Sequence, residues 1–320
     1  MEILMLEASV YGDDISLEKF DKLGNITKYA VSNYDEAIER LSIHNPDVVI
    51  VNKILMNKEA IDAAPNLKVI AEAATGYNNI DIEYAKEKGI RVANVAGYST
   101  ESVVQHTFAL LFYLLEKLRH YDDFVKTGQY AMWPVFSYFG NIFHELNGMK
   151  WGIVGLGNIG SKVARIAKDF GCEVLCYSAS GHKYDTEYRQ VEFDELLKES
   201  DIISIHAPLN EYTNNLFDYN ALSQMKKSAI LLNLGRGPIV NDADLTRALN
   251  EDLIAAAGLD VISVEPIKGD NPLLTIKDSD KLIITPHIAW ATHEARERLM
   301  DEIYENIVAY FEGRERNVIV

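Results

Sequence analysis

The sequence predicts an α/β protein built from two doubly wound parallel-sheet domains. Short runs of Val, Ile and Leu alternate with helical patterns from end to end, which is typical of parallel sheets covered by helices on both faces. The alternation comes in two series, with a change of pattern at Tyr98-Ser99-Thr100. A chain of 320 residues is also too long for one ordinary core.

The first series predicts five strands separated by helices or loops. The strands are expected at EILML, ITKYAV, DVVIV, LKVIAEAA and RVANV, and the helices at YDEAIERL, NKEAIDAA and DIEYAKEKG. A long helix is expected next, over residues 102–124 (SVVQHTFALLFYLLEKLRHYDDF). It is apolar around most of its circumference, so we expect it to be buried. An irregular segment rich in aromatic residues follows at 128–148.

The second series predicts six more strands, at MKWGIVG, EVLCYS, DIISIHA, AILLNLG, LIAAAGLDV and KLIITPH. One helix, over residues 291–313, ends the pattern. We expect the chain to cross between the domains near residues 98 and 288, so that the last helix returns to the first domain. The predicted domains are therefore 1–98 with 288–320, and 99–287.

The composition excludes several classes of binding partner. A formal net charge of −17 argues against nucleic acid and anionic membranes, although one buried Arg still permits a small anionic substrate. The two cysteines, Cys172 and Cys176, are too far apart along a strand for a disulfide, and we expect no metal site. The N-terminus lacks a basic signal region, and the most apolar run is half of a membrane span. These features predict a cytoplasmic protein.

The motif GLGNIG predicts a dinucleotide site, because it follows the apolar run WGIV and begins a helical pattern. Gly155 permits a tight turn, Gly157 allows a pyrophosphate to approach the backbone, and Gly160 allows close packing of helix and strand. The free N–H groups at the helix N-terminus then bind the phosphates.

The residue that should select the dinucleotide is unusual. An Asp or Glu normally lies about 20 residues after the glycines and binds the ribose hydroxyls of NAD, but this chain has Ser178. The serine removes the repulsion against the extra phosphate of NADP, and Ser180, His182 and Lys183 offer donors to it. This stretch contains no Arg, which is the usual residue for binding a phosphate, and Lys183 could equally be a solvated loop charge. We therefore expect relaxed specificity, with both NAD and NADP accepted.

Polar residues follow three strands of the second series, where a ligand crevice is expected. Arg236 follows the strand AILLNLG, and His287 ends the strand KLIITPH. Glu265 lies in GLDVISVEP, a few residues after the strand that ends in GLDV. Taken alone, each of these residues could have an ordinary structural role rather than a catalytic one. Together they form an acid–base set, with His as proton carrier, Glu as the residue that orients it and Arg as anion binder. Carbonyl reduction by hydride transfer needs such a set.

At this point the sequence resembles the NAD(P)-dependent D-isomer-specific 2-hydroxyacid dehydrogenases, and within them the glycerate dehydrogenase/hydroxypyruvate reductase branch. The resemblance covers nearly the whole chain and rests on GLGNIG, NLGRGPIVND, GLDVISVEP and TPHIAWATHEARERLM, in this order. It implies a flavodoxin-like substrate domain and a Rossmann cofactor domain, with the active site in the cleft between them.

The resemblance also implies residue roles. Arg236 would bind the substrate carboxylate and carbonyl, His287 would move the proton, and Glu265 would hold His287. The backbone amides of Thr75 and Gly76 would bind the carboxylate from the first domain. Besides the glycines and Ser178, the implied cofactor contacts are Asn158, Ile159, Ala207, Pro208, Thr213, Leu234, Gly235 and Asp260, the last on the nicotinamide carboxamide. We expect His206 to line this pocket and His106 to be structural.

The expected function is reduction of a small 2-oxoacid, hydroxypyruvate or glyoxylate, to the D-2-hydroxyacid. Trp290 and the segment at 98–111 resemble the glycerate dehydrogenase branch. Two alternatives stay open: another enzyme of the family, such as a D-lactate or aryl-lactate dehydrogenase, and a non-catalytic dinucleotide-sensing protein. Trp133 has two readings as well, as local core or as a residue that reaches the partner's site in a homodimer formed through the cofactor domain. The dimer is favoured, because so many loop aromatics need a surface to bury against.

Overall fold

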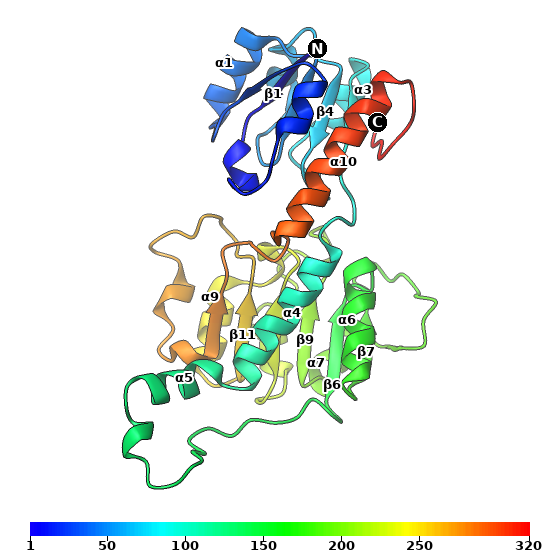
Figure 1. The fold of residues 1–320 in the computed structure, drawn as a ribbon. Helices are drawn as coiled ribbons and strands as arrows, with labels where there is room; N and C mark the ends of the chain where they lie inside the picture. Colours follow the sequence, from blue (N-terminus) through cyan, green and yellow to red (C-terminus); the bar gives the residue numbers. More distant parts are fainter. The chain divides into compact units, whose positions relative to one another are not determined.

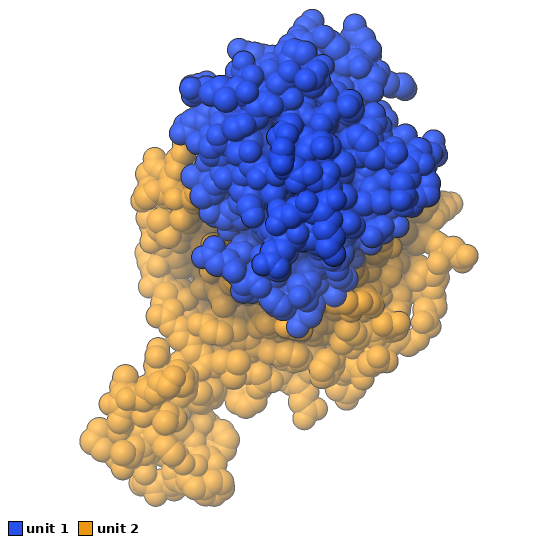
Figure 2. Space-filling model, turned by 45° about the horizontal axis from the view of Figure 1, so that its top comes forward, with its two compact units in different colours: residues 1–99, 291–320 blue, residues 100–290 orange.

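The computed structural model describes all 320 residues, and the chain divides into two compact units. Unit 1 comprises Met1–Ser99 and Ala291–Val320, and unit 2 comprises Thr100–Trp290 (Figure 2). The chain thus leaves unit 1 once and returns to it for its last helix. No helix combines the length and the apolar character needed to cross a membrane.

Unit 1 contains a parallel five-stranded sheet in the order β2-β1-β3-β4-β5, which is the flavodoxin-like order. Its strands are β1 (Glu2–Met5), β2 (Asn25–Lys28), β3 (Val48–Val51), β4 (Val69–Glu72) and β5 (Arg91–Ala93). Its helices are α1 (Tyr34–His44), α2 (Lys58–Asp62), α3 (Ile82–Glu87) and α10 (His293–Phe311). The last of these, α10, packs against β4 (Figure 1).

Local sequence explains these elements. Asn33 and Glu36 form a capping box that begins α1, with each side chain bonded to the other residue's backbone N–H. The central strands β3 and β4 are buried along their whole length, as expected for strands with helices on both faces. Leu4, Val49 and Ile70 lie in one apolar cluster, and each such fully buried side chain contributes about 1.5–3 kcal/mol.

Unit 2 contains a parallel seven-stranded sheet in the order β12-β11-β10-β9-β6-β7-β8. This is the Rossmann order with one more strand, and the order reverses between β6 and β9. The strands are β6 (Lys150–Val154), β7 (Glu173–Tyr177), β8 (Arg189–Gln190), β9 (Ile202–Ile205), β10 (Ile230–Asn233), β11 (Ala256–Leu259) and β12 (Leu282–Ile284). A ligand crevice is expected at the reversal, beyond the carboxyl ends of these two strands.

Helices cover both faces of this sheet (Figure 1). Ile202 and Leu232 face one cluster, Ile203 and Leu231 the other, because successive strand residues point to opposite faces. On one side lie α4 (Thr100–Leu115) and α6 (Asn158–Asp169), and on the other α7 (Phe193–Glu199), α8 (Tyr219–Gln224) and α9 (Asp242–Asn250). The predicted α/β architecture of two parallel-sheet domains is confirmed.

One expected element is wrong. The single helix over 102–124 is two helices, because Lys117 adopts a left-handed conformation with φ of 53° and ends the first of them. The second, α5 (Leu118–Lys126), buries only Phe124, whereas α4 is buried on most of its surface. The strand expected at 26–31 is also shorter, and the two-residue β8 was not predicted.

Candidate active site

The glycine loop joins β6 to α6 at the reversal of strand order. Gly155 has φ of +89°, and a Cβ there would lie 2.8 Å from the backbone N and Cα of Ala207, which follows β9. A Cβ on Gly160 would lie 2.1 Å from the carbonyl oxygen of Gly155. Both positions therefore require glycine, one for the turn and one for close packing of helix and strand.

Gly157 is different, because its surroundings are open. It is the N-cap of α6 and supplies no side-chain cap, and no atom lies within 4 Å of the place where its Cβ would be. Asn158 and Ile159 form the first turn of the helix. N–H groups without a side-chain cap at the start of a 12-residue helix, next to the open space at Gly157, fit the pyrophosphate of a dinucleotide.

The other residues expected at the cofactor follow the carboxyl ends of four strands of this sheet. These are Ser178 after β7, Ala207 and Pro208 after β9, Leu234 and Gly235 after β10, and Asp260 after β11. Thr213 lies in the loop beyond β9, where its buried hydroxyl donates to the carbonyl of Pro208 at 2.7 Å. All of them lie at the same edge of the sheet as the glycine loop.

His287 and Glu265 are in direct contact. Nδ1 of His287 lies 2.7 Å from Oε2 of Glu265, whose other oxygen accepts the backbone N–H of Ile262 at 3.3 Å. The carboxylate therefore fixes the imidazole with Nδ1 protonated and leaves Nε2 for a reacting group. This is the arrangement expected of a proton carrier with its orienting acid.

Arg236 lies on the turn that follows β10. Its side chain is exposed, and Nη1 donates to the carbonyl of Gly235 at 2.9 Å. The amide side chain of Asn233 holds the turn, because Oδ1 accepts the N–H of Gly235 at 3.1 Å and Nδ2 donates to the carbonyl of Arg236 at 3.0 Å. A Cβ on Gly237 would overlap the carbonyl of Ile262 at 1.8 Å, so this turn also requires glycine.

Asn233 was not singled out from the sequence. It is fully buried at the end of β10, and both ends of its amide are used. The available signal was a polar residue that ends the apolar run ILLN. Its contacts leave the guanidinium of Arg236 exposed on a fixed turn, where it can bind an anion.

Asp260 lies beneath the turn that carries His287. Its carboxylate accepts three donors, the hydroxyl of Thr285 at 2.7 Å and the N–H groups of Ile288 and Ala289, each at 2.9 Å. A carboxylate offers about four acceptor positions, so one remains for a further donor such as a carboxamide. Thr285 was also missed from the sequence, because its partner is distant along the chain.

His206, at the end of β9, is held without charge. Its Nε2 lies 3.0 Å from the hydroxyl of Ser204, which also accepts the indole N–H of Trp151 at 2.9 Å. Burial lowers the pKa of His206 to about 3, and its buried Nδ1 has no hydrogen-bond partner. A neutral imidazole at this place suits a lining residue better than a proton carrier.

Thr75 and Gly76 belong to unit 1, in the loop that follows β4. The hydroxyl of Thr75 donates to the carbonyl of Val95 at 3.0 Å, and its own carbonyl accepts from Asn94 at 2.7 Å. The N–H groups of Thr75 and Gly76 donate to no protein acceptor. The loop is thus fixed while these two N–H groups remain able to bind an anion.

Glu72 precedes this loop and is fully buried. One carboxyl oxygen accepts from the side chain of Asn79 at 2.9 Å, and the other has no partner. Burial raises the pKa of Glu72 to about 8, so the carboxyl is mostly protonated at neutral pH.

The chain is similar to known proteins over its whole length. Residues 108–289 match the family model described as D-isomer specific 2-hydroxyacid dehydrogenase, NAD binding domain. A hydroxypyruvate reductase of Blautia hydrogenotrophica is 38% identical over 325 residues, which cover 100% of this chain and 99% of that protein.

Two solved structures extend the comparison. An acyclic imino acid reductase in complex with NADPH and D-Arg is 32% identical, with a TM-score of 0.87 and 100% of both chains covered. A D-lactate dehydrogenase of Aquifex aeolicus, complexed with NAD and lactic acid, is 29% identical, with a TM-score of 0.83 and with 98% of this chain and 96% of that chain covered.

Proposed function

Since the chain belongs to the D-isomer specific 2-hydroxyacid dehydrogenase family, we propose that it reduces hydroxypyruvate or glyoxylate to the D-2-hydroxyacid. Membership makes the chain an NAD-binding oxidoreductase that acts on CH–OH groups, as the sequence predicted. The observation that carries the proposal is the contact of 2.7 Å between His287 and Glu265, on the sheet that also carries the glycine loop. A proton donor beside a dinucleotide loop is what carbonyl reduction requires.

The roles follow from the chemistry of the reaction. The bound nicotinamide supplies a hydride to C2 of the 2-oxoacid. Negative charge then develops on the carbonyl oxygen, where the guanidinium of Arg236 and protonated His287 stabilise it. His287 donates its proton from Nε2, because Nδ1 faces Glu265. The carboxylate of Glu265 fixes the orientation of the ring.

The substrate carboxylate would be bound by Arg236 and by the N–H groups of Thr75 and Gly76. Arg236 is suited to this, because its planar fork matches a carboxylate in a bidentate manner. The two N–H groups are suited because their own loop leaves them without an acceptor. The residues implied by the resemblance, from Asn158 to Asp260, would hold the dinucleotide.

Both dinucleotides are proposed as cofactors. Ser178 follows β7, and its hydroxyl lies 3.3 Å from that of Ser180. Because position 178 carries no carboxylate, a 2′-phosphate is not repelled there, and the hydroxyls of Ser178 and Ser180 are available to bind it. The related imino acid reductase holds NADPH and the related D-lactate dehydrogenase holds NAD, which supports acceptance of either.

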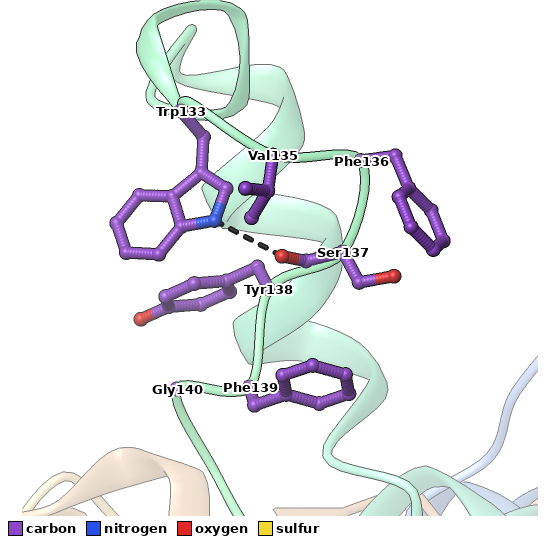
Figure 3. A pocket seen from close by; sticks show the side chains of 7 residues that line it. All are labelled: Trp133, Val135, Phe136, Ser137, Tyr138, Phe139 and Gly140. Atoms are coloured by element: carbon purple, nitrogen blue, oxygen red, sulfur yellow. Dashed lines mark hydrogen bonds between the residues drawn. The ribbon is translucent and has the colours of Figure 1, made fainter.

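We also propose a homodimer formed through the aromatic segment 128–148 of unit 2. Seven of its residues line a hollow of about 490 Å³, namely Trp133, Val135, Phe136, Ser137, Tyr138, Phe139 and Gly140 (Figure 3). Trp133 and Tyr138 lie together with ring centroids 4.9 Å apart, whereas Phe136 and Phe139 point away from them. Phe136 is 91% exposed and Phe139 85%.

An apolar surface of this kind favours a second copy of the chain as its partner, because monomers seldom expose several adjacent large rings. Trp133 would then reach toward the partner's site. The net charge of −17 and the two unpaired thiols support a cytoplasmic protein without nucleic-acid or membrane partners.

Steady-state turnover tests the proposal. The purified protein is given NADH or NADPH with hydroxypyruvate, glyoxylate, pyruvate or phenylpyruvate, and the loss of nicotinamide absorbance is followed. We expect kcat/KM to be largest for the first two substrates. A larger value for pyruvate or phenylpyruvate would assign a D-lactate or aryl-lactate dehydrogenase instead. Cofactor binding with no turnover above that of His287→Ala would leave a dinucleotide-sensing protein.

A further inference from the structure

The turn that carries His287 has an unfavourable backbone conformation. His287 has φ of 54°, in the left-handed region that residues with a side chain rarely adopt. Such a conformation persists only where the surroundings hold it in place. Whatever holds this turn therefore also sets the direction of the imidazole.

Asp260 closes the turn. Its backbone carbonyl accepts the N–H of His287 at 2.9 Å, and its two carboxylate oxygens accept the next two N–H groups, those of Ile288 and Ala289. Three consecutive N–H groups are thus directed at one residue. Asp260 is 2% exposed, so these bonds are shielded from competing water.

A second set of contacts holds the carboxylate itself. The hydroxyl of Thr285 lies 2.7 Å from Oδ1 of Asp260, and Nε2 of His106 lies 2.9 Å from the same hydroxyl. A carboxylate only accepts, so Thr285 donates to it. A hydroxyl has one hydrogen, so His106 must donate from Nε2 to Thr285. The donor and acceptor of both hydrogen bonds are therefore fixed: His106 donates to Thr285, and Thr285 donates to Asp260.

This series of hydrogen bonds begins on a buried helix. His106 belongs to α4, which packs against β10, β11 and β12, the strands that precede the Arg236, Asp260 and His287 turns. The side chain of His106 is 20% exposed. Its contact with Thr285 joins the buried helix to the turn of the proton donor.

We propose that His106 and Thr285 are positioning residues for His287. They orient the carboxylate of Asp260 so that it closes the left-handed turn and directs Nε2 of His287 toward the substrate carbonyl. The inference rests on the proposed role of His287 as proton donor. It assigns a task to His106 and Thr285 in proton transfer and none in substrate binding, so kcat and KM should respond differently.

Matched variants test the hydrogen bonds rather than the packing. Thr285→Val keeps the shape of the side chain and removes the hydroxyl, and Thr285→Ser keeps the hydroxyl. We expect Thr285→Val to lower kcat at least about tenfold with the substrate KM changed less than about threefold, and Thr285→Ser to stay within about twofold of wild type. His106→Leu and His106→Gln form a second pair, because Gln retains an N–H donor. Thr246→Val, a buried hydroxyl on α9, is the control.

A double-variant comparison shows whether the effect passes through His287. In the His287→Ala background, Thr285→Val should change kcat less than about twofold, because the group that it positions is already absent. An equal loss in both backgrounds would mean a merely structural role and would overturn the inference. Full activity of Thr285→Val and His106→Leu would overturn it as well.

Amide hydrogen exchange gives a readout that does not require turnover. Exchange at the N–H groups of Ile288 and Ala289 should rise at least about tenfold in Thr285→Val and stay near wild type in Thr285→Ser. Unchanged exchange in Thr285→Val would refute the positioning role. Inactivity of the wild-type protein with every 2-oxoacid would instead refute the proposed function, so the two failures are distinct.

Discussion

Oε2 of Glu265 lies 2.7 Å from Nδ1 of His287, although the two residues follow different strands of the sheet. The contact engages Nδ1 of the imidazole, so Nε2 is the nitrogen left for the proposed proton transfer. Because the carboxylate accepts the hydrogen bond from Nδ1, it holds the ring in one orientation.

Replacing His287 by Ala should therefore remove proton donation. We expect kcat for reduction to fall by about two to four orders of magnitude, with cofactor affinity nearly unchanged. Cofactor affinity is measured by quenching of protein fluorescence and kcat by steady-state turnover. A variant that keeps about a tenth of the activity would exclude His287 as the donor.

The parts of the site that could be predicted from the sequence are those with a local pattern. Gly155, Gly157 and Gly160 lie within six residues, and Arg236 and His287 each lie at or just after the end of an apolar run, so the sequence pattern predicts them as site residues. Asn233 and Thr285 were missed, because their importance depends on partners on neighbouring strands or turns. Residue type alone does not show such contacts.

For the fold as well, the elements with a local sequence pattern could be predicted, and those that depend on tertiary contacts could not. Apolar periodicity predicted the strands and most helices, since burial on both faces leaves a continuous apolar run. It did not predict the break at Lys117, where the left-handed backbone ends α4 although helical residues continue on both sides. Element boundaries of this kind depend on tertiary packing rather than on local propensity.

Arg236 should not be replaceable by Lys. The guanidinium is presented on a turn that Asn233 and Gly237 hold, and a single ammonium cannot form the same two parallel bonds to a carboxylate. We expect Arg236→Lys to lower kcat/KM by about two orders of magnitude or more. Turnover at varied substrate concentration measures the loss. Near-wild-type KM and kcat would show that the carboxylate is bound elsewhere.

The carboxyl group of Glu72 should make the stability of the protein depend on pH. Its pKa is raised from 4.5 to about 8 by burial, so its contribution to stability is complete below about pH 4.5 and is lost as the pH rises through about 8. Glu72→Gln does not titrate. Its free energy of unfolding in urea should therefore fall less than that of wild type between about pH 5 and pH 9.

A matched control separates this effect from the general effect of charge. Glu39 is exposed and shares no ion pair, so Glu39→Gln should show the pH dependence of wild type. Parallel curves for wild type and Glu72→Gln would mean that Glu72 is ionised in the folded protein at neutral pH.

The proposed dimer should depend on the exposed rings of the aromatic segment. Phe136→Lys combined with Phe139→Lys would place two charges on the surface that is to be buried, and we expect the monomer mass by light scattering on a sizing column. Ile43→Lys is the control, because Ile43 is 68% exposed in unit 1 and lies outside the segment. A wild-type protein of monomer mass at micromolar concentration would contradict the dimer.

Ser178 should set the choice between the two dinucleotides. It follows β7, the strand next to the glycine-loop strand β6, and its side chain is 8% exposed. An Asp at this position would accept both ribose hydroxyls of NAD and repel the 2′-phosphate of NADP, because two anions would lie close together in a partly desolvated place. We expect Ser178→Asp to shift the ratio of kcat/KM toward NADH over NADPH by at least about tenfold, which is about 1.4 kcal/mol. Ser178→Ala removes the hydroxyl without adding charge, so it should shift the ratio much less than Asp does. The ratio is measured with both cofactors at one saturating 2-oxoacid concentration. If the wild type already prefers NADH by about a thousandfold, another residue excludes the phosphate and the role given to Ser178 is wrong.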